Sequence, residues 1–576
     1  MKRTLKLLLL AAIGWLGLVA HPAFAQGVQG MHGQLVSAGW LKDRLGARNL
    51  VLLDASPTKF YLAGHIPGAV SVSFTKEESS SQNVNLSYGG GIDLIGDTET
   101  APFAFQDRPV AEMQELFRSW GVTRDSHVVL YDTGGAMHAT RLFFSFVYHG
   151  FPLKNLHILD GGMAKWTSLQ YPVSQEVHAP ARRGDFRITG VKSDIKTSVP
   201  EVLAASGDPV NNALVEGLTP DWHFGEALNY DRRGHIPHAI MAPAADFYNA
   251  DKTFKSPQDI RKMLAHLGIK PEQAIFTHCG GGIAGSVPFF AIKYLAGYPK
   301  VKHFTESQLG WLHDQRSLPF WTYDAPYLLR DAAWLQWWGG QRTRSLGSIH
   351  VSIVDVRAEP AFREQHVPFA LNVPADVFRK ELRNPVALRQ ALGTAGVNPS
   401  HEAVVVSGAG ISKDAALAFV ALEALGQKKV SILSDGLDKW AAQGFPLRDT
   451  PTVVAPRKVR FDLAVPPVDY KSKDRAGVLI ADAAATSGVY PKLYIASGKE
   501  LPANVPAGKV VHVPYTELLQ ADGTPKPAAT IWAILHKAGV TRYAELVTVS
   551  DDVGEAAANH VVLKLMGFPD VKTLVL

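Results

Sequence analysis

The sequence is almost without cysteine, since Cys279 is the only one among 576 residues. One cysteine allows no internal disulfide bond, so the folded chain depends on ordinary hydrophobic cores. No group of His, Cys and Asp with the spacing of a zinc site is visible either, and we expect neither a metal nor a cofactor. A chain of this length is expected to form several domains.

Long apolar runs are absent beyond the N-terminus, which excludes a later transmembrane helix. The first residues differ: Lys2, Arg3 and Lys6 precede an apolar stretch over 7–20, and Ala23-Phe24-Ala25 fits a small-x-small cleavage site. This order predicts a signal peptide at 1–25, cleaved near Ala25, and export to the periplasm. An uncleaved membrane anchor is disfavoured because the apolar run is short and contains two glycines, so we expect no stable membrane insertion.

An excess of one charge sign is also missing, with 58 Lys and Arg against 53 Asp and Glu. A nearly balanced surface gives no reason to expect nucleic acid as a partner. The apolar share of 46% and the aromatic share of 9% are typical of a globular protein.

One unit recurs along the chain: an apolar strand ending in an acidic residue, a turn with His and Pro, a second apolar strand with a loop, and a tryptophan. The three clear copies have opening strands at 51–54, 213–216 and 353–355, turns at 64–69, 234–239 and 365–370, and tryptophans Trp166, Trp311 and Trp440. The loops begin at Asp132, Cys279 and Ser407, which are 34, 32 and 33 residues before those tryptophans. A weaker fourth copy is predicted from the strands at 478–482 and 546–551.

Helical stretches at 110–120, 259–267 and 415–425 lie between the strands. Alternating strands and helices predict an α/β fold whose parallel sheets are covered on both faces. Ligands of such sheets bind at the carboxyl ends of the strands, which is where the Cys279 loop falls. The predicted domains are 26–185, 186–326, 327–452 and 453–576.

Cys279 opens a glycine-rich loop, Cys279-Gly280-Gly281-Gly282-Ile283-Ala284, between a short apolar strand and an apolar helix over 287–292. A strand, a tight loop and a helix surround the sulfur with backbone N–H groups, which favours a thiolate. Glycines permit the backbone angles and the close approach that this needs. We therefore predict that Cys279 is a catalytic nucleophile rather than a small buried hydrophobe. Gly280, Gly281, Gly282, Ile283 and Ala284 are predicted to bind the anionic sulfur.

The turn Gly64-His65-Ile66-Pro67-Gly68-Ala69, the Cys-Gly-x-Gly-Ile loop and the run Asp160-Gly161-Gly162 before Trp166 together resemble the rhodanese family of sulfurtransferases. The resemblance covers essentially the whole mature chain. It implies four rhodanese-like domains in two tandem pairs, of which only the second is catalytic. Asp132, Ser407 and Asp551 are expected at the position of Cys279 in the other copies, which could not form a persulfide.

The resemblance further implies that Cys279 takes sulfur from a small donor as a persulfide and passes it to cyanide or a thiol. Thiosulfate and 3-mercaptopyruvate both remain open as donors. The loop is small and uncharged, as in relatives that use mercaptopyruvate, but Gly281 and Ala284 stand where those carry serine and threonine. Arg232 and Arg233 either supply positive charge for an anionic donor or form a solvated basic pair.

Other functions fit less well. A rhodanese-like phosphatase or arsenate reductase needs an arginine that closes the loop on an oxyanion, and the next arginine here is Arg316. A sulfur or selenium carrier that uses Cys279 without rapid turnover stays possible. His278 is expected to be a packed structural histidine, since adjacent strand residues face opposite sides. The turn histidines His65, His235 and His366 are expected to be structural, because they recur in copies without cysteine.

Overall fold

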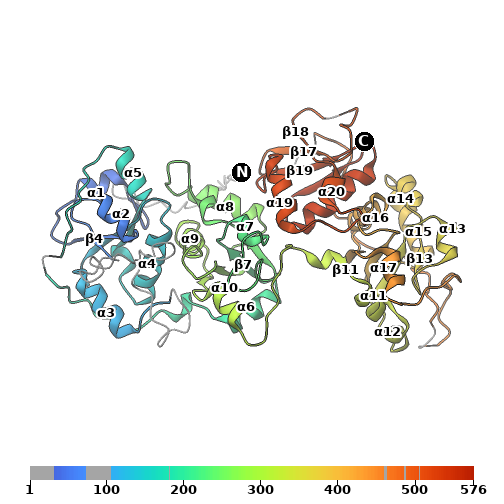
Figure 1. The fold of residues 1–576 in the computed structure, drawn as a ribbon, viewed down its shortest axis with the longest axis horizontal. Helices are drawn as coiled ribbons and strands as arrows, with labels where there is room; N and C mark the ends of the chain where they lie inside the picture. Colours follow the sequence, from blue (N-terminus) through green and yellow to red (C-terminus); the bar gives the residue numbers. More distant parts are fainter. Residues whose placement is uncertain (1–30, 73–105, 181, 460–462, 485–487, 505) are drawn as a thin grey trace, which may run out of the picture.

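The computed structural model describes residues 31–72, 106–180, 182–459, 463–484, 488–504 and 506–576. The predicted signal peptide at 1–25 lies outside these residues. Within the part of the chain that is described, no helix is long and apolar enough to cross a membrane. The described residues form four sheets with helices around them (Figure 1).

The first domain has a sheet with the order β1-β2-β6-β5-β3-β4, parallel except for β1 with β2. Its strands are β1 (Met31–His32), β2 (Leu35–Val36), β3 (Leu50–Asp54), β4 (Val70–Ser71), β5 (His127–Tyr131) and β6 (Leu156–Leu159). Its helices are α1 (Ala38–Lys42), α2 (Thr58–Ala63), α3 (Val110–Ser119), α4 (Met137–Tyr148) and α5 (Gly162–Ser168).

The second domain has a parallel sheet with the order β10-β9-β7-β8. Its strands are β7 (Asn212–Glu216), β8 (Ala239–Met241), β9 (Ala274–His278) and β10 (Val301–His303). Its helices are α6 (Val199–Ser206), α7 (Pro220–His223), α8 (Pro257–His266), α9 (Ser286–Phe290), which continues as a π-helical turn over Ala291–Leu295, and α10 (Ser307–His313).

The third domain repeats this order with one more edge strand, β11-β15-β14-β12-β13. Its strands are β11 (Leu329–Arg330), β12 (Val351–Asp355), β13 (Leu371–Asn372), β14 (Glu402–Val406) and β15 (Lys429–Leu433). Its helices are α11 (Ala332–Gly339), α12 (Gln341–Ser345), α13 (Glu359–Glu364), α14 (Ala375–Glu381), α15 (Pro385–Thr394), α16 (Lys413–Ala424) and α17 (Gly436–Ala442).

The fourth domain has the order β16-β20-β19-β17-β18, again parallel. Its strands are β16 (Leu479–Ile480), β17 (Lys492–Ala496), β18 (Lys509–His512), β19 (Glu545–Val549) and β20 (Val571–Leu574). Its helices are α18 (Tyr515–Leu518), α19 (Ala528–Lys537) and α20 (Val553–Leu565). The predicted α/β fold with four copies of one unit is therefore confirmed.

Two details predicted for the fourth copy are wrong. The segment 478–482 supplies only the edge strand β16, and β17 occupies the place of the opening strand between β18 and β19. Both segments are short and apolar, so their pattern does not distinguish a central strand from an edge strand. Asp551 is also not the equivalent of Cys279, because β19 ends at Val549 and Ser550 follows it directly, as Cys279 follows β9.

The helices that follow the four loops pair the domains as predicted. α4 packs on α9 between the first and second domains, and α16 packs on α20 between the third and fourth. Phe143 of α4 meets Phe290 of α9 edge-on, with ring centroids 4.9 Å apart. One apolar core runs through the first pair and another through the second. Because each loop lies at the start of one of these helices, both loops of a pair lie close to its interface.

The two pairs meet through the second and fourth domains, which lie side by side in Figure 1 (green and red). The Tyr543 hydroxyl donates a hydrogen bond of 2.6 Å to Asp246, and His266 Nε2 donates one of 2.7 Å to the carbonyl of Arg542. The rings of Phe224 and Trp532 stack with centroids 5.1 Å apart. The domain that carries Cys279 therefore contacts both an N-terminal and a C-terminal neighbour.

Candidate active site

Cys279 directly follows β9, between the neighbouring strands β7 and β10 at the carboxyl end of the second sheet. The residue is buried, with 3% of its surface exposed. The N–H of Gly282 donates to the Cys279 sulfur at 3.1 Å. The loop therefore directs a backbone dipole at the sulfur, and this dipole stabilises negative charge there.

Ser307, at the start of α10, holds the other side of Cys279. Its hydroxyl accepts a 3.0 Å hydrogen bond from the Cys279 N–H and donates one of 2.8 Å to the carbonyl of Phe304. The same oxygen lies 3.9 Å from the sulfur. The thiol therefore lies between the N–H of Gly282 and the hydroxyl of Ser307.

Ser307 has a left-handed backbone with φ of 53°. The equivalent residues, four before the tryptophan in the first and third copies, are Gly162 with φ of 53° and Gly436 with φ of 63°. A non-glycine residue with this backbone is strained, and such residues gather at functional sites. Sequence reasoning missed Ser307, although the exchange of glycine for serine within the repeat was its signal.

The loop glycines are required by close packing. Gly282 has φ of 92°, and a Cβ there would lie 2.1 Å from the carbonyl oxygen of Thr305. His303 Nε2 donates a 2.8 Å hydrogen bond to the carbonyl of Gly282. Burial, with the charge of Arg141, lowers the pKa of His303 to about 3, so this histidine acts as a neutral support for the loop.

The first domain shows what the same loop does around an anion. Asp132 stands where Cys279 does, and its two carboxylate oxygens accept four backbone N–H groups at 3.0–3.3 Å, from Gly134, Ala136, His138 and Ala139. The loop after the second strand of the repeat can therefore enclose a negative charge with amides alone. In the first domain the Asp132 carboxylate itself occupies the space that the loop amides surround.

The third domain uses its loop differently. The Ser407 hydroxyl donates to the carbonyls of Ala409 and Gly410, so the loop presents acceptors to it rather than amides. The loop amides of Gly410 and Ile411 donate instead to the carbonyls of Asp522 and Gly523 in the fourth domain. The N–H groups of Gly410 and Ile411 are therefore occupied by the fourth domain and do not surround Ser407.

The guanidinium groups of the predicted arginines hydrogen-bond to carbonyls outside the loop. Arg232 donates from its Nη1 to the carbonyl of Leu318 at 2.7 Å, and Arg233 donates to the carbonyls of Gly225 and Glu226. Among the described residues, neither guanidinium hydrogen-bonds to residues 279–284. Among the predicted loop residues, Gly282 is the one whose N–H bonds to the sulfur, and Gly280, Gly281, Ile283 and Ala284 form the turn around it.

Two residues that sequence reasoning missed face this loop, next to the arginines in the chain. Asn229 is buried, and its Oδ1 lies 3.7 Å from where a Cβ of Gly280 would be. Its Nδ2 has no hydrogen-bond partner among the described residues. Burial and the nearby charge of Cys279 raise the pKa of Tyr230 to about 12, so its phenol stays protonated at neutral pH and can donate a hydrogen bond. Both side chains offer donors for an anionic substrate.

The histidines near the site have structural roles, as predicted. Burial lowers the pKa of His278 to about 4, and its Nε2 lies 3.9 Å from Glu216, so it is neutral and faces the strand β7. The turn histidines share one contact, a hydrogen bond from Nδ1 to a backbone carbonyl. The pairs are His65 with Tyr61, His235 with His223, and His366 with Phe362.

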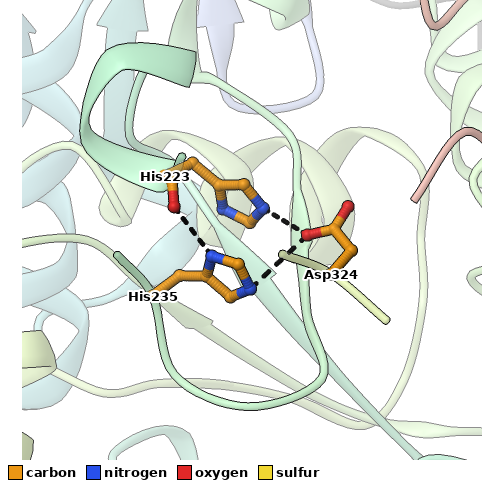
Figure 2. A group of neighbouring side chains, drawn as sticks. All are labelled: His223, His235 and Asp324. Atoms are coloured by element: carbon orange, nitrogen blue, oxygen red, sulfur yellow. Dashed lines mark hydrogen bonds and ion pairs between the residues drawn. The ribbon is translucent and has the colours of Figure 1, made fainter. Parts of the chain in front are cut away.

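A second polar cluster, of His223, His235 and Asp324, lies in the same domain (Figure 2). One ligand atom from each lies within 4.8 Å of the others, close enough to consider a metal ion. The two imidazole rings, however, are stacked, with centroids 3.7 Å apart and planes 3° from parallel. An ion about 2.0–2.1 Å from both Nε2 atoms would lie outside both ring planes, away from the lone pairs. The arrangement therefore fits a metal poorly.

The cluster fits a buried ion network instead. His223 contacts Glu216 through Nδ1 and Asp324 through Nε2, the latter at 2.5 Å. Burial alone lowers the pKa of His223, but the carboxylates of Asp324 and Glu216 outweigh it and raise the pKa to about 9. His223 is therefore a cation at neutral pH. Burial and this cation lower the pKa of His235 to about 4, so His235 is neutral.

Comparisons with known proteins find matches to the rhodanese-like domain and to proteins named for sulfur transfer. A family model of the rhodanese-like domain matches residues 37–169 and 342–443, in the first and third domains. The sulfur carrier protein TtuD of Thermus thermophilus is 28% identical over 292 residues, which are 48% of this chain and 93% of that protein. A putative thiosulfate sulfurtransferase of Haloferax volcanii is 28% identical over 297 residues, 48% of this chain and 92% of the relative. A probable 3-mercaptopyruvate sulfurtransferase of Pseudomonas aeruginosa is 27% identical over 293 residues, 49% of this chain and 96% of the relative.

Proposed function

We propose, from the premise that this chain is built of tandem rhodanese-like domains, that its second domain is a sulfurtransferase with Cys279 as the nucleophile. The observation that carries the proposal is the Cys279 sulfur at the end of β9, with the N–H of Gly282 directed at it from 3.1 Å. The equivalent residues Asp132, Ser407 and Ser550 have no sulfur. One domain of the four is therefore competent for sulfur transfer.

The reaction has two steps. The Cys279 thiolate attacks the outer sulfur of the donor, so a new S–S bond forms while the old bond to that sulfur breaks and its electron pair leaves with the remainder of the donor. From thiosulfate the leaving group is sulfite; from 3-mercaptopyruvate it is the enolate of pyruvate, which takes a proton from solvent. Cyanide or a thiolate then attacks the terminal sulfur of the persulfide, and the thiolate of Cys279 is restored.

The loop stabilises the anionic sulfur in both steps. The N–H of Gly282 contacts the sulfur, and the close packing of Gly282 on Thr305 and the hydrogen bond from His303 hold this geometry. Preorganised backbone donors lower the energy of a developing anion without a reorganisation cost. The four amides around Asp132 show that this type of loop holds an anion in the same molecule. In the persulfide, the negatively charged terminal sulfur lies next to residues 280–284, as the Asp132 carboxylate lies next to its own loop.

Thiosulfate and 3-mercaptopyruvate are both proposed as donors, since relatives bear both names. Both donors are anions. Among the described residues, the Nδ2 of Asn229, which has no hydrogen-bond partner, and the phenol of Tyr230 support anion binding beside the loop. Arg232 and Arg233 remain candidates for long-range attraction of an anion, although their guanidinium groups bond to carbonyls. We further propose that the protein works in the periplasm after cleavage near Ala25.

The test is thiocyanate formation by the purified mature protein, with cyanide and each donor in turn. Cys279→Ser keeps the shape but removes a polarisable and easily ionised nucleophile. Activity in this variant should fall to the level without enzyme, while Ser407→Ala, the matched change in the third domain, should leave activity unchanged. Donor-dependent turnover in Cys279→Ser above that background would overturn the proposal.

A sulfur carrier is the second candidate, favoured by the burial of Cys279 and by the name of one relative. A carrier and an enzyme share the persulfide but differ in its release. A carrier would take up one sulfur atom per chain and release it slowly to small acceptors. Many turnovers per chain with cyanide or a small thiol would exclude this candidate.

A further inference from the structure

The acidic residue at the end of the opening strand has a different partner in the second domain than in the third. In the third domain Asp355 pairs with Arg357, two residues later, at 2.7 Å. In the second domain Glu216 is wholly buried, and Leu218 stands two residues later, where the third domain has Arg357. Its cationic partner is His223, seven residues later on α7. The active domain has therefore replaced a local ion pair with a histidine.

The position of His223 is aromatic in the other clear copies. The turn histidines His65 and His366 stack on Tyr61 and Phe362, with ring centroids 3.8 and 3.9 Å apart, and His235 stacks on His223 at 3.7 Å. The stacking role needs only an aromatic ring. A charged imidazole at this place contacts two carboxylates at once through its two nitrogen atoms, which the single hydroxyl of Tyr and the apolar ring of Phe cannot do.

The second carboxylate, Asp324, leads to another domain. It lies on the segment before β11, and its Oδ1 is 2.5 Å from His223 Nε2. Its Oδ2 is 3.3 Å from Nη1 of Arg542, which belongs to the fourth domain and has a side chain only 7% exposed. Glu216 and Asp324 carry two negative charges, and His223 and Arg542 carry two positive ones. A buried network with balanced charge loses much when one member is removed, because the rest stays buried and unpaired.

The opposite end of the network leads to Cys279. Gln308 on α10 donates from its side chain to Glu216. The backbone N–H of the same residue donates to the Cys279 carbonyl at 3.0 Å, and the neighbouring residue Ser307 holds the Cys279 N–H. A displacement of Glu216 would therefore act on the start of α10, where both backbone contacts of Cys279 originate.

We propose that the buried chain Gln308–Glu216–His223–Asp324–Arg542 is a positioning device through which the docked fourth domain holds the Cys279 loop in its reactive geometry. The inference rests on the proposed sulfur transfer. It gives the fourth domain, which has no cysteine, a role in the reaction of the second. His223, Asp324 and Arg542 act through Gln308 and are positioning residues.

The most specific test removes the charge of Arg542 and keeps the other contacts between the second and fourth domains. Arg542→Met keeps the backbone carbonyl that accepts from His266, so this interdomain contact survives. Tyr543→Phe is the matched control, because it removes the adjacent interdomain hydrogen bond to Asp246 without touching the chain. We expect the rate of persulfide formation and kcat to fall about tenfold in Arg542→Met, as for partners in one hydrogen-bond network, with KM little changed. Tyr543→Phe should match the wild type, and Arg542→Lys should recover part of the loss.

A double-mutant cycle separates positioning from a general loss of stability. Glu216 and Arg542 do not contact each other in the structure but lie on one chain of contacts. The rate losses of Glu216→Gln and Arg542→Met should be strongly non-additive, because either change breaks the same chain. Additive losses, or an Arg542→Met rate equal to that of Tyr543→Phe, would overturn the inference. If Arg542→Met does not fold, the cycle is made with Arg542→Lys, and the same two outcomes decide.

The two proposals fail in distinguishable ways. A wild-type protein that forms no persulfide with any donor contradicts the sulfurtransferase, whatever the variants do. A wild-type protein that forms the persulfide, with Arg542 variants equal to the control, contradicts only the positioning role of the fourth domain.

Discussion

At the scale of a residue, Ser307 combines a strained backbone with a side-chain hydrogen bond to Cys279. Its left-handed backbone favours glycine, as in the first and third copies, yet its hydroxyl holds the Cys279 N–H at 3.0 Å. Ser307→Gly should therefore keep or raise the free energy of unfolding, since it removes strain worth about 1 kcal/mol. The rate of sulfur transfer should fall roughly tenfold, the value of about one hydrogen bond. Denaturant unfolding and the thiocyanate assay measure the two effects. An unfolding free energy that falls while the rate stays at the wild-type level would contradict this role.

The residues of the site differ in how well the sequence predicts them. Cys279 and its glycines are predictable because they are adjacent in the chain and form one strand–loop–helix pattern. Asp324 lies 101 residues from His223, and no local pattern encodes a contact over that separation. Arg232 and Arg233 are predicted to bind an anion from their charge alone, and the sequence does not show that carbonyls of residues 225, 226 and 318 accept hydrogen bonds from them. The neighbouring residues Asn229 and Tyr230 carry no charge that would single them out in the sequence.

At the scale of an element, the backbone N–H groups of the loop after β5 bind the carboxylate of Asp132. Asp132→Asn should destabilise the first domain by about 2–4 kcal/mol, because the amide NH₂ cannot accept the two backbone N–H groups that one carboxylate oxygen now accepts. Calorimetric unfolding measures the change, and Ser407→Ala in the third domain is the comparison, since that hydroxyl donates to the carbonyls of Ala409 and Gly410. Equal stability of Asp132→Asn and the wild type would show that the four amides do not bind the carboxylate.

The elements of the first three copies follow from their sequence pattern, and those of the fourth do not. Parallel strands buried on both faces read as short apolar runs, and β5, β9 and β14 fall where such runs precede a loop. In the fourth copy two runs compete for the place of the opening strand, and the more central, β17, contains Tyr494 and is preceded by Pro491. The burial of each strand in the assembled sheet, rather than its own sequence pattern, decides which of β16 and β17 is central.

At the scale of the whole molecule, the network between the second and fourth domains makes stability depend on pH. The folded pKa of His223, about 9, is raised above its usual value of about 6.5, so its contribution to stability is complete below pH 6.5 and is lost as the pH rises to about 9. The shift corresponds to about 3 kcal/mol. The groups facing His223 are Glu216, Asp324, Arg542, His235 and His278.

The melting temperature of the second domain should therefore fall between pH 6.5 and about 9 in the wild type. Asp324→Asn removes one of the two carboxylates that hold the proton on His223 and so lowers its folded pKa; the fall should still begin near pH 6.5 but should be smaller and end at a lower pH in this variant. Calorimetric scans across this pH range compare the two proteins. Identical pH profiles would show that His223 is not held as a cation between the two carboxylates.

The predicted export of the protein to the periplasm is also testable. Expressed from its full sequence in a Gram-negative host, the mature protein should begin at or near Gln26 and be recovered from the periplasm, because the basic start, apolar core and Ala23-x-Ala25 order are those of a cleaved signal peptide. N-terminal sequencing of the periplasmic fraction measures this. Soluble cytoplasmic protein with an intact Met1 would contradict export.

The central claim, that one sulfur atom moves through Cys279, is tested most directly by intact mass spectrometry of the purified protein after incubation with each donor. The account predicts a mass gain of one sulfur atom that maps to Cys279, disappears on addition of cyanide, and is absent in Cys279→Ser. No gain with either donor, or the same gain in Cys279→Ser, would contradict it.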